Sequence, residues 1–123
     1  NPATLKTAIS KLSKLMSKVW NNYQGIKSQY EALSSKEPEG LIERVKKVNL
    51  SGNNDLERKK AGVEACMRYI SKDGKVINLY EVLDETRSRY NFLKTVMNSI
   101  EYKRSVLITM NGALKIENSL SED

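Results

Sequence analysis

Lysine side chains are the residues of this chain whose type and spacing most clearly suggest chemistry. The first 36 residues hold six lysines and one acidic residue, whereas residues 61–123 hold nine bases and nine acids. Lys11, Lys14 and Lys18 follow one another at intervals of three and four, so a helix would place them on one face. Such a strip of ammonium groups suits the phosphates of nucleic acid or of anionic lipid, and it also suits a face that only meets water.

A second group of basic residues flanks an Asn-rich loop that we expect at residues 49–54. Its members are Arg44, Lys46, Lys47, Arg58, Lys59 and Lys60. Five acids lie beside them in the sequence, namely Glu37, Glu39, Glu43, Asp55 and Glu57. The local charge therefore nearly cancels, which weakens the case for a phosphate site here.

Catalytic and metal chemistry find little support in the composition. The chain has no histidine and one cysteine, which excludes the common zinc and iron clusters and the His-dependent nucleophiles. Glu81, Asp84 and Glu85 gather where a helix is expected to begin, and there acids stabilise the helix dipole. We therefore expect no catalytic residue, no cofactor and no metal. Cys66 lies on an apolar face, and we expect it to be a small buried residue.

Aromatic residues of the first segment are candidates for contact with a partner. Trp20, Tyr23 and Tyr30 lie close together on the helix expected there. They can be part of the core, they can anchor a protein interface, or they can stack on bases beside the lysines.

The first segment predicts a long helix over residues 2–35. Asn1 and Pro2 suit an N-cap and a first helical position, while Pro38 and Gly40 mark the end. Gly25 weakens the helix interior. Apolar residues alternate at intervals of four and three, as in a heptad seam: Leu5, Ile9, Leu12, Met16, Val19, Tyr23, Ile26, Tyr30 and Leu33.

The last segment predicts a second long helix, over residues 79–117, with Asn78 as its cap. Its seam holds Val82, Leu83, Tyr90, Leu93, Met97, Ile100, Leu107 and Leu114. Thr86, Arg104 and Asn111 fall on the same seam. We interpret Arg104 and Asn111 as partner-binding candidates that set the register of a helix pair.

The middle of the chain predicts a short helical segment at 39–48 and a helix at 55–72. Asn54 and Glu57 have the spacing of a capping box for the latter. Residues 72–75 then form a turn. An alternative is that this Asp-Gly turn is the tip of a small hairpin flanked by residues 68–70 and 76–79.

One stretch of the last helix resembles a known family. Ser88, Arg89, Tyr90 and Asn91, with the seam that continues through Ile100 and Leu107, are similar to the last coiled-coil helix of type III secretion needle-tip proteins. Long first and last helices around a smaller insert are also similar, although that family usually has a larger middle. The resemblance implies a secretion- or virulence-associated helical bundle.

The sequence as a whole predicts one helical domain over residues 1–123. The expected fold is all-α, an antiparallel three-helix bundle or coiled-coil hairpin with two long terminal helices and a shorter helical middle. The expected function is that of a non-enzymatic helical protein–protein interaction module. It would bind another protein or, by self-assembly, a copy of itself. The alternative is a basic nucleic-acid-binding protein that uses the Lys-rich face of the first helix.

The compartment is left open by the sequence. No run of about 18 apolar residues occurs, so no transmembrane segment is expected. The N-terminal residues lack a signal-peptide pattern. A single cysteine suits a reducing compartment and also secretion without disulfides.

Overall fold

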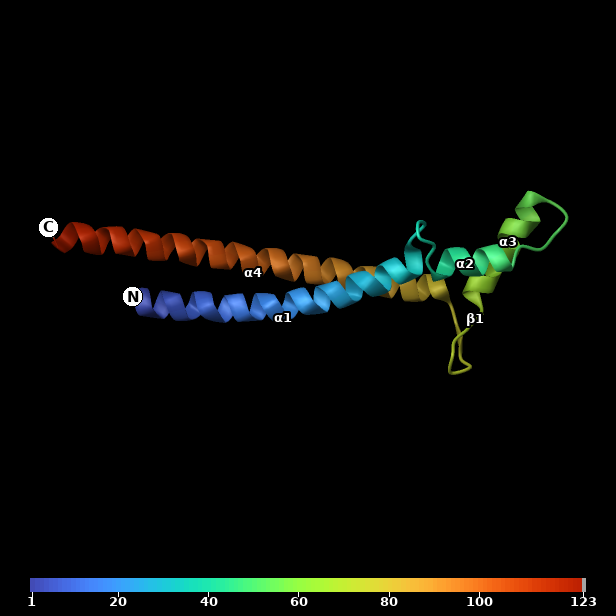
Figure 1. Cartoon of the computed structure of the whole chain (residues 1–123), viewed down its shortest axis with the longest axis horizontal. Helices are drawn as coiled ribbons and strands as arrows, with labels where there is room; N and C mark the ends of the chain where they lie inside the picture. Colours follow the sequence, from blue (N-terminus) through green and yellow to red (C-terminus); the bar gives the residue numbers. More distant parts are fainter. Residues whose placement is uncertain (123) are drawn as a thin grey trace. The chain divides into compact units, whose positions relative to one another are not determined.

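The computed structural model describes residues 1–122, and over these residues the fold is all-α apart from one small hairpin (Figure 1). The helical class predicted from the sequence is therefore confirmed, while the three-helix arrangement stays a prediction. The elements in chain order are α1 (Pro2–Ser34), α2 (Leu41–Val48), α3 (Asp55–Met67), β1 (Tyr69–Ile70), β2 (Val76–Ile77) and α4 (Leu79–Glu122).

The chain divides into two compact units, and each long helix contributes to both. The first unit combines Asn1–Gln24 with the chain from Phe92 onward, and the second is Gly25–Asn91. Each unit is described by itself below, and the single domain expected from the length stays a prediction.

In the first unit, α1 and α4 run antiparallel and contact each other along their heptad seams (Figure 1). Val19 of α1 and Ile100 of α4 are the buried hydrophobic residues of this unit within the described part of the chain. A hydrogen bond crosses between the helices, from Arg104 Nε to Ser13 Oγ at 3.1 Å. At the start of α1 the Asn1 side chain accepts a hydrogen bond from Thr4 N at 3.0 Å, which confirms the predicted N-cap.

In the second unit, α2 packs against α3 over a small buried cluster. The cluster consists of Ile42, Val45, Cys66 and Leu79. Cys66 is fully buried, as predicted, and burial raises the pKa of its thiol. Gly62 lets the two helices approach closely, because a Cβ atom at this position would lie 3.0 Å from the carbonyl oxygen of Lys46.

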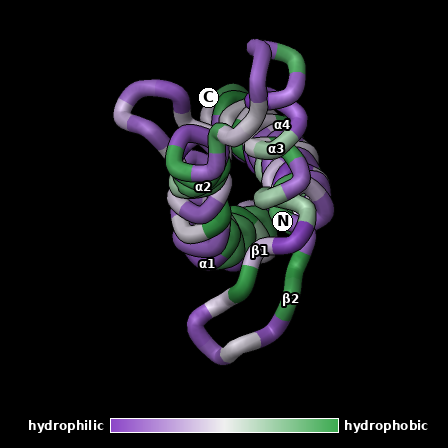
Figure 2. The backbone as a smooth tube through the Cα atoms, turned by 90° about the vertical axis from the view of Figure 1, so that its right-hand side faces the viewer, coloured by the Kyte–Doolittle hydropathy of each residue, from purple (hydrophilic) through white to green (hydrophobic). Residues whose placement is uncertain are grey.

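The middle segment corrects one prediction. The helix expected over 55–72 ends at Met67, because Tyr69 and Ile70 pair with Ile77 and Val76 in an antiparallel hairpin. Gly74 forms its turn with a φ of +80°, a conformation that favours glycine. In Figure 2 the two strands are hydrophobic and the tip between them is hydrophilic. The alternative hairpin was therefore right, and the longer helix was wrong.

The remaining boundaries differ by only a few residues. The segment expected at 39–48 becomes helical at Leu41, because Gly40 has an extended backbone. The last helix begins at Leu79 as predicted but continues to Glu122 rather than stopping near 117. None of the helices in the described part of the chain has a stretch long and apolar enough to cross a membrane.

Candidate functional site

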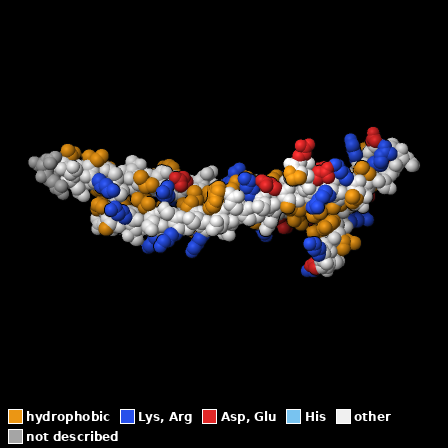
Figure 3. Space-filling view, in the orientation of Figure 1, with side chains coloured by type: hydrophobic (Ala, Val, Ile, Leu, Met, Phe, Trp, Pro, Cys, Tyr) orange, Lys and Arg blue, Asp and Glu red, His pale blue; other side chains and the backbone are white. Residues whose placement is uncertain are grey.

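The predicted lysine strip lies on the solvent-exposed side of α1. Lys11, Lys14 and Lys18 are all exposed, and none of the ion pairs between described residues involves them. They are on the face of the helix away from the heptad seam that contacts α4. Figure 3 shows basic side chains and no acidic ones along the visible lower edge of this part of α1. The structure therefore presents these three lysines together to solvent.

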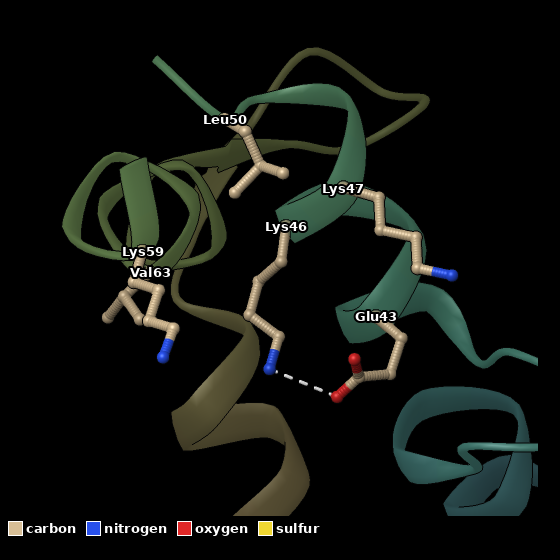
Figure 4. A pocket seen from close by; sticks show the side chains of 6 residues that line it. All are labelled: Glu43, Lys46, Lys47, Leu50, Lys59 and Val63. Atoms are coloured by element: carbon tan, nitrogen blue, oxygen red, sulfur yellow. Dashed lines mark ion pairs between the residues drawn. The ribbon is translucent and has the colours of Figure 1, made fainter. Parts of the chain in front are cut away.

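The second basic group is only partly brought together, around a pocket between α2 and α3. The pocket has a volume of about 340 Å³, and Figure 4 shows side chains from both helices around it. Its lining residues are Glu43, Lys46, Lys47, Leu50, Lys59 and Val63. Of the other predicted residues, Arg58 pairs with Asp55 at 2.6 Å, Arg44 lines a separate groove, and Lys60 lines neither.

The charges around this pocket are largely neutralised within the protein. Lys46 Nζ lies 3.0 Å from Glu43 Oε1, and Lys47 pairs with Glu39. Lys59 is the one lysine lining the pocket that forms no ion pair with another described residue. A phosphate would have to compete with carboxylates already in place, so the pocket is better suited to apolar groups than to anions.

The three aromatic candidates fall into two separate contacts. In the first unit the rings of Trp20 and Tyr23 lie 5.6 Å apart, and Trp20 remains 47% exposed beside a shallow pocket of about 290 Å³. In the second unit Tyr30 stacks on Tyr90 at 5.5 Å, and the Arg87 guanidinium lies 5.9 Å from the centre of the Tyr30 ring. A hydrogen bond from Arg87 lowers the pKa of Tyr30. Tyr30 thus takes part in an internal contact, whereas Trp20 is accessible.

The two polar seam candidates lie where α1 and α4 meet. Arg104 contacts Ser13, as described above, and its guanidinium also lies 3.5 Å from Glu101 Oε1. Asn111 is one heptad further along α4. Its Oδ1 atom is buried, and no hydrogen-bond partner for it occurs among the described residues. A buried amide oxygen without a partner is costly, so Asn111 reduces the stability of this seam.

Helix α4 carries a second apolar stripe that was not predicted from the sequence. It consists of Tyr102, Val106, Thr109, Ala113, Ile116 and Leu120, which we call the α4 stripe. All six residues are exposed, and the exposed fraction is 72% for Tyr102, 70% for Leu120 and 64% for Ile116. The intervals are again four and three, but Thr109 and Ala113 break the run of large apolar side chains that would have revealed it.

A groove adjoins the α4 stripe within the first unit. It has a volume of about 270 Å³ and is lined by Leu12 of α1 and by Tyr102, Lys103, Val106 and Leu107 of α4. Because Tyr102 and Val106 belong to both, the stripe and the groove form one continuous surface. This surface can accept another helix, since exposed apolar residues at heptad spacing match the contacts of helix pairs.

Comparison of the chain with protein-family models, with curated proteins and with solved structures finds no match.

Proposed function

We propose that this chain is a non-enzymatic helical interaction module whose docking surface is the α4 stripe. The observation that carries the proposal is the heptad spacing of six exposed residues on a helix whose other seam already contacts α1. A helix with two such seams is typical of a protein that binds a further helix. The resemblance of the segment around Tyr90 to needle-tip helices adds a secretion- or virulence-associated assembly as one setting for such a module.

The small core supports this proposal. Among the described residues only six hydrophobic side chains are buried. The chain exposes 9124 Å² of surface. A compact monomer of its 14.0 kDa mass would expose about 6,700 Å². Sixteen large hydrophobic side chains among the described residues are exposed, which favours burial against another molecule.

The acids at the start of α4 support a structural rather than a catalytic role. Glu81 lies in the first turn of α4, where its charge stabilises the helix dipole. Asp84 and Arg87 form an exposed ion pair at 3.2 Å, three residues apart on the same helix. We therefore propose no reaction for this chain.

Site-specific photo-crosslinking tests the proposal. A photoreactive phenylalanine analogue is placed at Ile116 in the α4 stripe and, as the control, at Lys14 on the lysine face. In the cells that naturally contain the protein, we expect protein adducts from position 116, to any partner including a second copy, and few from position 14. Equal adduct yields at the two positions would contradict the proposal.

The lysine face favours a second candidate function, the binding of nucleic acid through its phosphates. Lys11, Lys14 and Lys18 are exposed together, and no acid occurs before Glu31. Three phosphate contacts would make the affinity for a DNA duplex fall about 40-fold between about 50 and 200 mM salt.

Fluorescence anisotropy with a labelled duplex tests this second function. A variant with the three lysines replaced by glutamine should lose binding at low salt. The matched control replaces Arg44, Lys59 and Lys60 and should bind as the wild type does. Affinity that is independent of salt, or equal losses in both variants, would refute this function.

A further inference from the structure

We propose that the α4 stripe binds the α4 stripe of a second copy of this chain, with the two helices antiparallel. The inference rests on the proposed function, and it names the partner and the register of the contact. It follows from the residues that flank the stripe and from the position of the stripe relative to the side of α4 that packs against α1.

The heptad positions of the stripe can be assigned from its spacing. Val106, Ala113 and Leu120 occupy a positions, and Tyr102, Thr109 and Ile116 occupy d positions. The flanking e positions are Lys103, Met110 and Glu117. The flanking g positions are Ser105, Gly112 and Ser119. One flank therefore carries one base and one acid at its two ends, and the other flank is small and uncharged.

This pattern is complementary to itself in an antiparallel pair. The stripe is centred on residue 111, so position 103 lies opposite position 119 of the second copy. Glu117 of the second copy is then offset by about 3 Å along the axis, within reach of the Lys103 ammonium. The two-fold axis of the dimer produces the Lys103–Glu117 contact twice. Between these two contacts, Met110 of one copy lies beside Met110 of the other.

A parallel pair would not use these charges. In a parallel coiled coil the e positions of one helix face the g positions of the other. Lys103 would then face Asn98, and Glu117 would face Gly112, neither of which carries a charge. The flanking charges thus favour the antiparallel orientation over the parallel one.

The position of α1 leaves room for the second copy. Ile100 and Leu107 belong to the seam that packs toward α1, and the d positions Tyr102 and Thr109 lie about 200° around the helix from them. The a position Val106 lies about 100° from Leu107 and borders the groove that Leu12 of α1 also lines. A stable interface needs about 800 Å² from each partner, so the contact must extend along the whole stripe from Tyr102 to Leu120.

Sedimentation equilibrium of the purified chain with charge-exchange variants tests the inference. Lys103→Glu and Glu117→Lys should each weaken the dimer about tenfold, because each replaces two attractive contacts by two repulsive ones. The double variant should restore the wild-type dissociation constant. An equimolar mixture of the two single variants should form a heterodimer of near wild-type affinity. Lys115→Glu, at a c position outside the stripe, is the control and should leave the dimer unchanged.

Three results would overturn the inference. The first is a wild-type chain that stays monomeric up to millimolar concentration. The second is single variants that dimerise as well as the wild type, and the third is a double variant without recovery. All the variant positions are exposed, and circular dichroism should show unchanged helicity. A monomeric chain that still crosslinks to another protein through position 116 would refute the inference while the proposed function stands.

Discussion

Replacing Asn111 by leucine should stabilise the seam between α1 and α4 in the first unit. The buried Oδ1 atom of Asn111 has no hydrogen-bond partner among the described residues. Leucine has a similar size and suits a heptad seam, so Asn111→Leu removes the unsatisfied group and adds apolar contact.

The expected gain follows from the cost of a buried polar atom without a partner, about 1–3 kcal/mol. Leucine also has a higher helix propensity than asparagine, which adds less than about 0.7 kcal/mol. Asn98→Leu measures that propensity alone, since Asn98 is exposed on the same helix. The difference between the two variants isolates the seam contribution and corresponds to about 4 °C in Tm for each kcal/mol.

Thermal and denaturant unfolding, followed by circular dichroism, provide the assay. We expect the free energy of unfolding to rise by at least about 1 kcal/mol more for Asn111→Leu than for Asn98→Leu. Equal effects, or a loss of stability in Asn111→Leu, would show that Asn111 is satisfied in solution and would refute the reasoning.

Five further variants, at four positions, test the second unit. Gly62→Ala should destabilise the α2–α3 contact, because its Cβ would lie 3.0 Å from the Lys46 carbonyl oxygen. Gly25→Ala has open space around it and should raise the free energy of unfolding by about 1 kcal/mol in denaturant unfolding. The reverse order of the two free energies would contradict the packing. Asn54→Ala should cost about 1 kcal/mol in the same assay and Asn54→Asp much less, since Asn54 Oδ1 accepts from Glu57 N at 2.9 Å; equal costs would exclude a capping role. Burial raises the pKa of Cys66, so its contribution to stability is complete below the unfolded thiol pKa of about 8.5 and declines as the pH rises above it. The denaturant midpoint of the wild type should therefore fall more between about pH 7 and pH 10 than that of Cys66→Ala, and parallel pH profiles would contradict this.

The long helices could be predicted from the sequence because their information is local. The caps at Asn1 and Asn54, the heptad seams and the stop before Pro38 act within a few residues of one another. The position of Arg104 and Asn111 on the α1–α4 seam followed from the same periodicity, and both side chains are half-buried there.

Other features depend on contacts that periodicity does not encode. The hairpin replaced the end of the predicted helix because strand pairing and a Gly74 turn outweighed an apolar pattern that fits either structure. Tyr30 stacks on Tyr90 although the two are far apart in sequence. The α4 stripe stayed hidden because its two central residues, Thr109 and Ala113, are not large and apolar.

Protection of a single engineered cysteine tests the central claim most directly. Ala113→Cys places a thiol at the middle of the α4 stripe, and Ser10→Cys places one on exposed α1, while the native Cys66 is buried. The maleimide labelling rate is measured in the cells that naturally contain the protein and divided by the rate for the unfolded chain. If the α4 stripe is a helix-docking surface, position 113 will be labelled much more slowly than position 10. Equal normalised rates at the two positions would contradict the account.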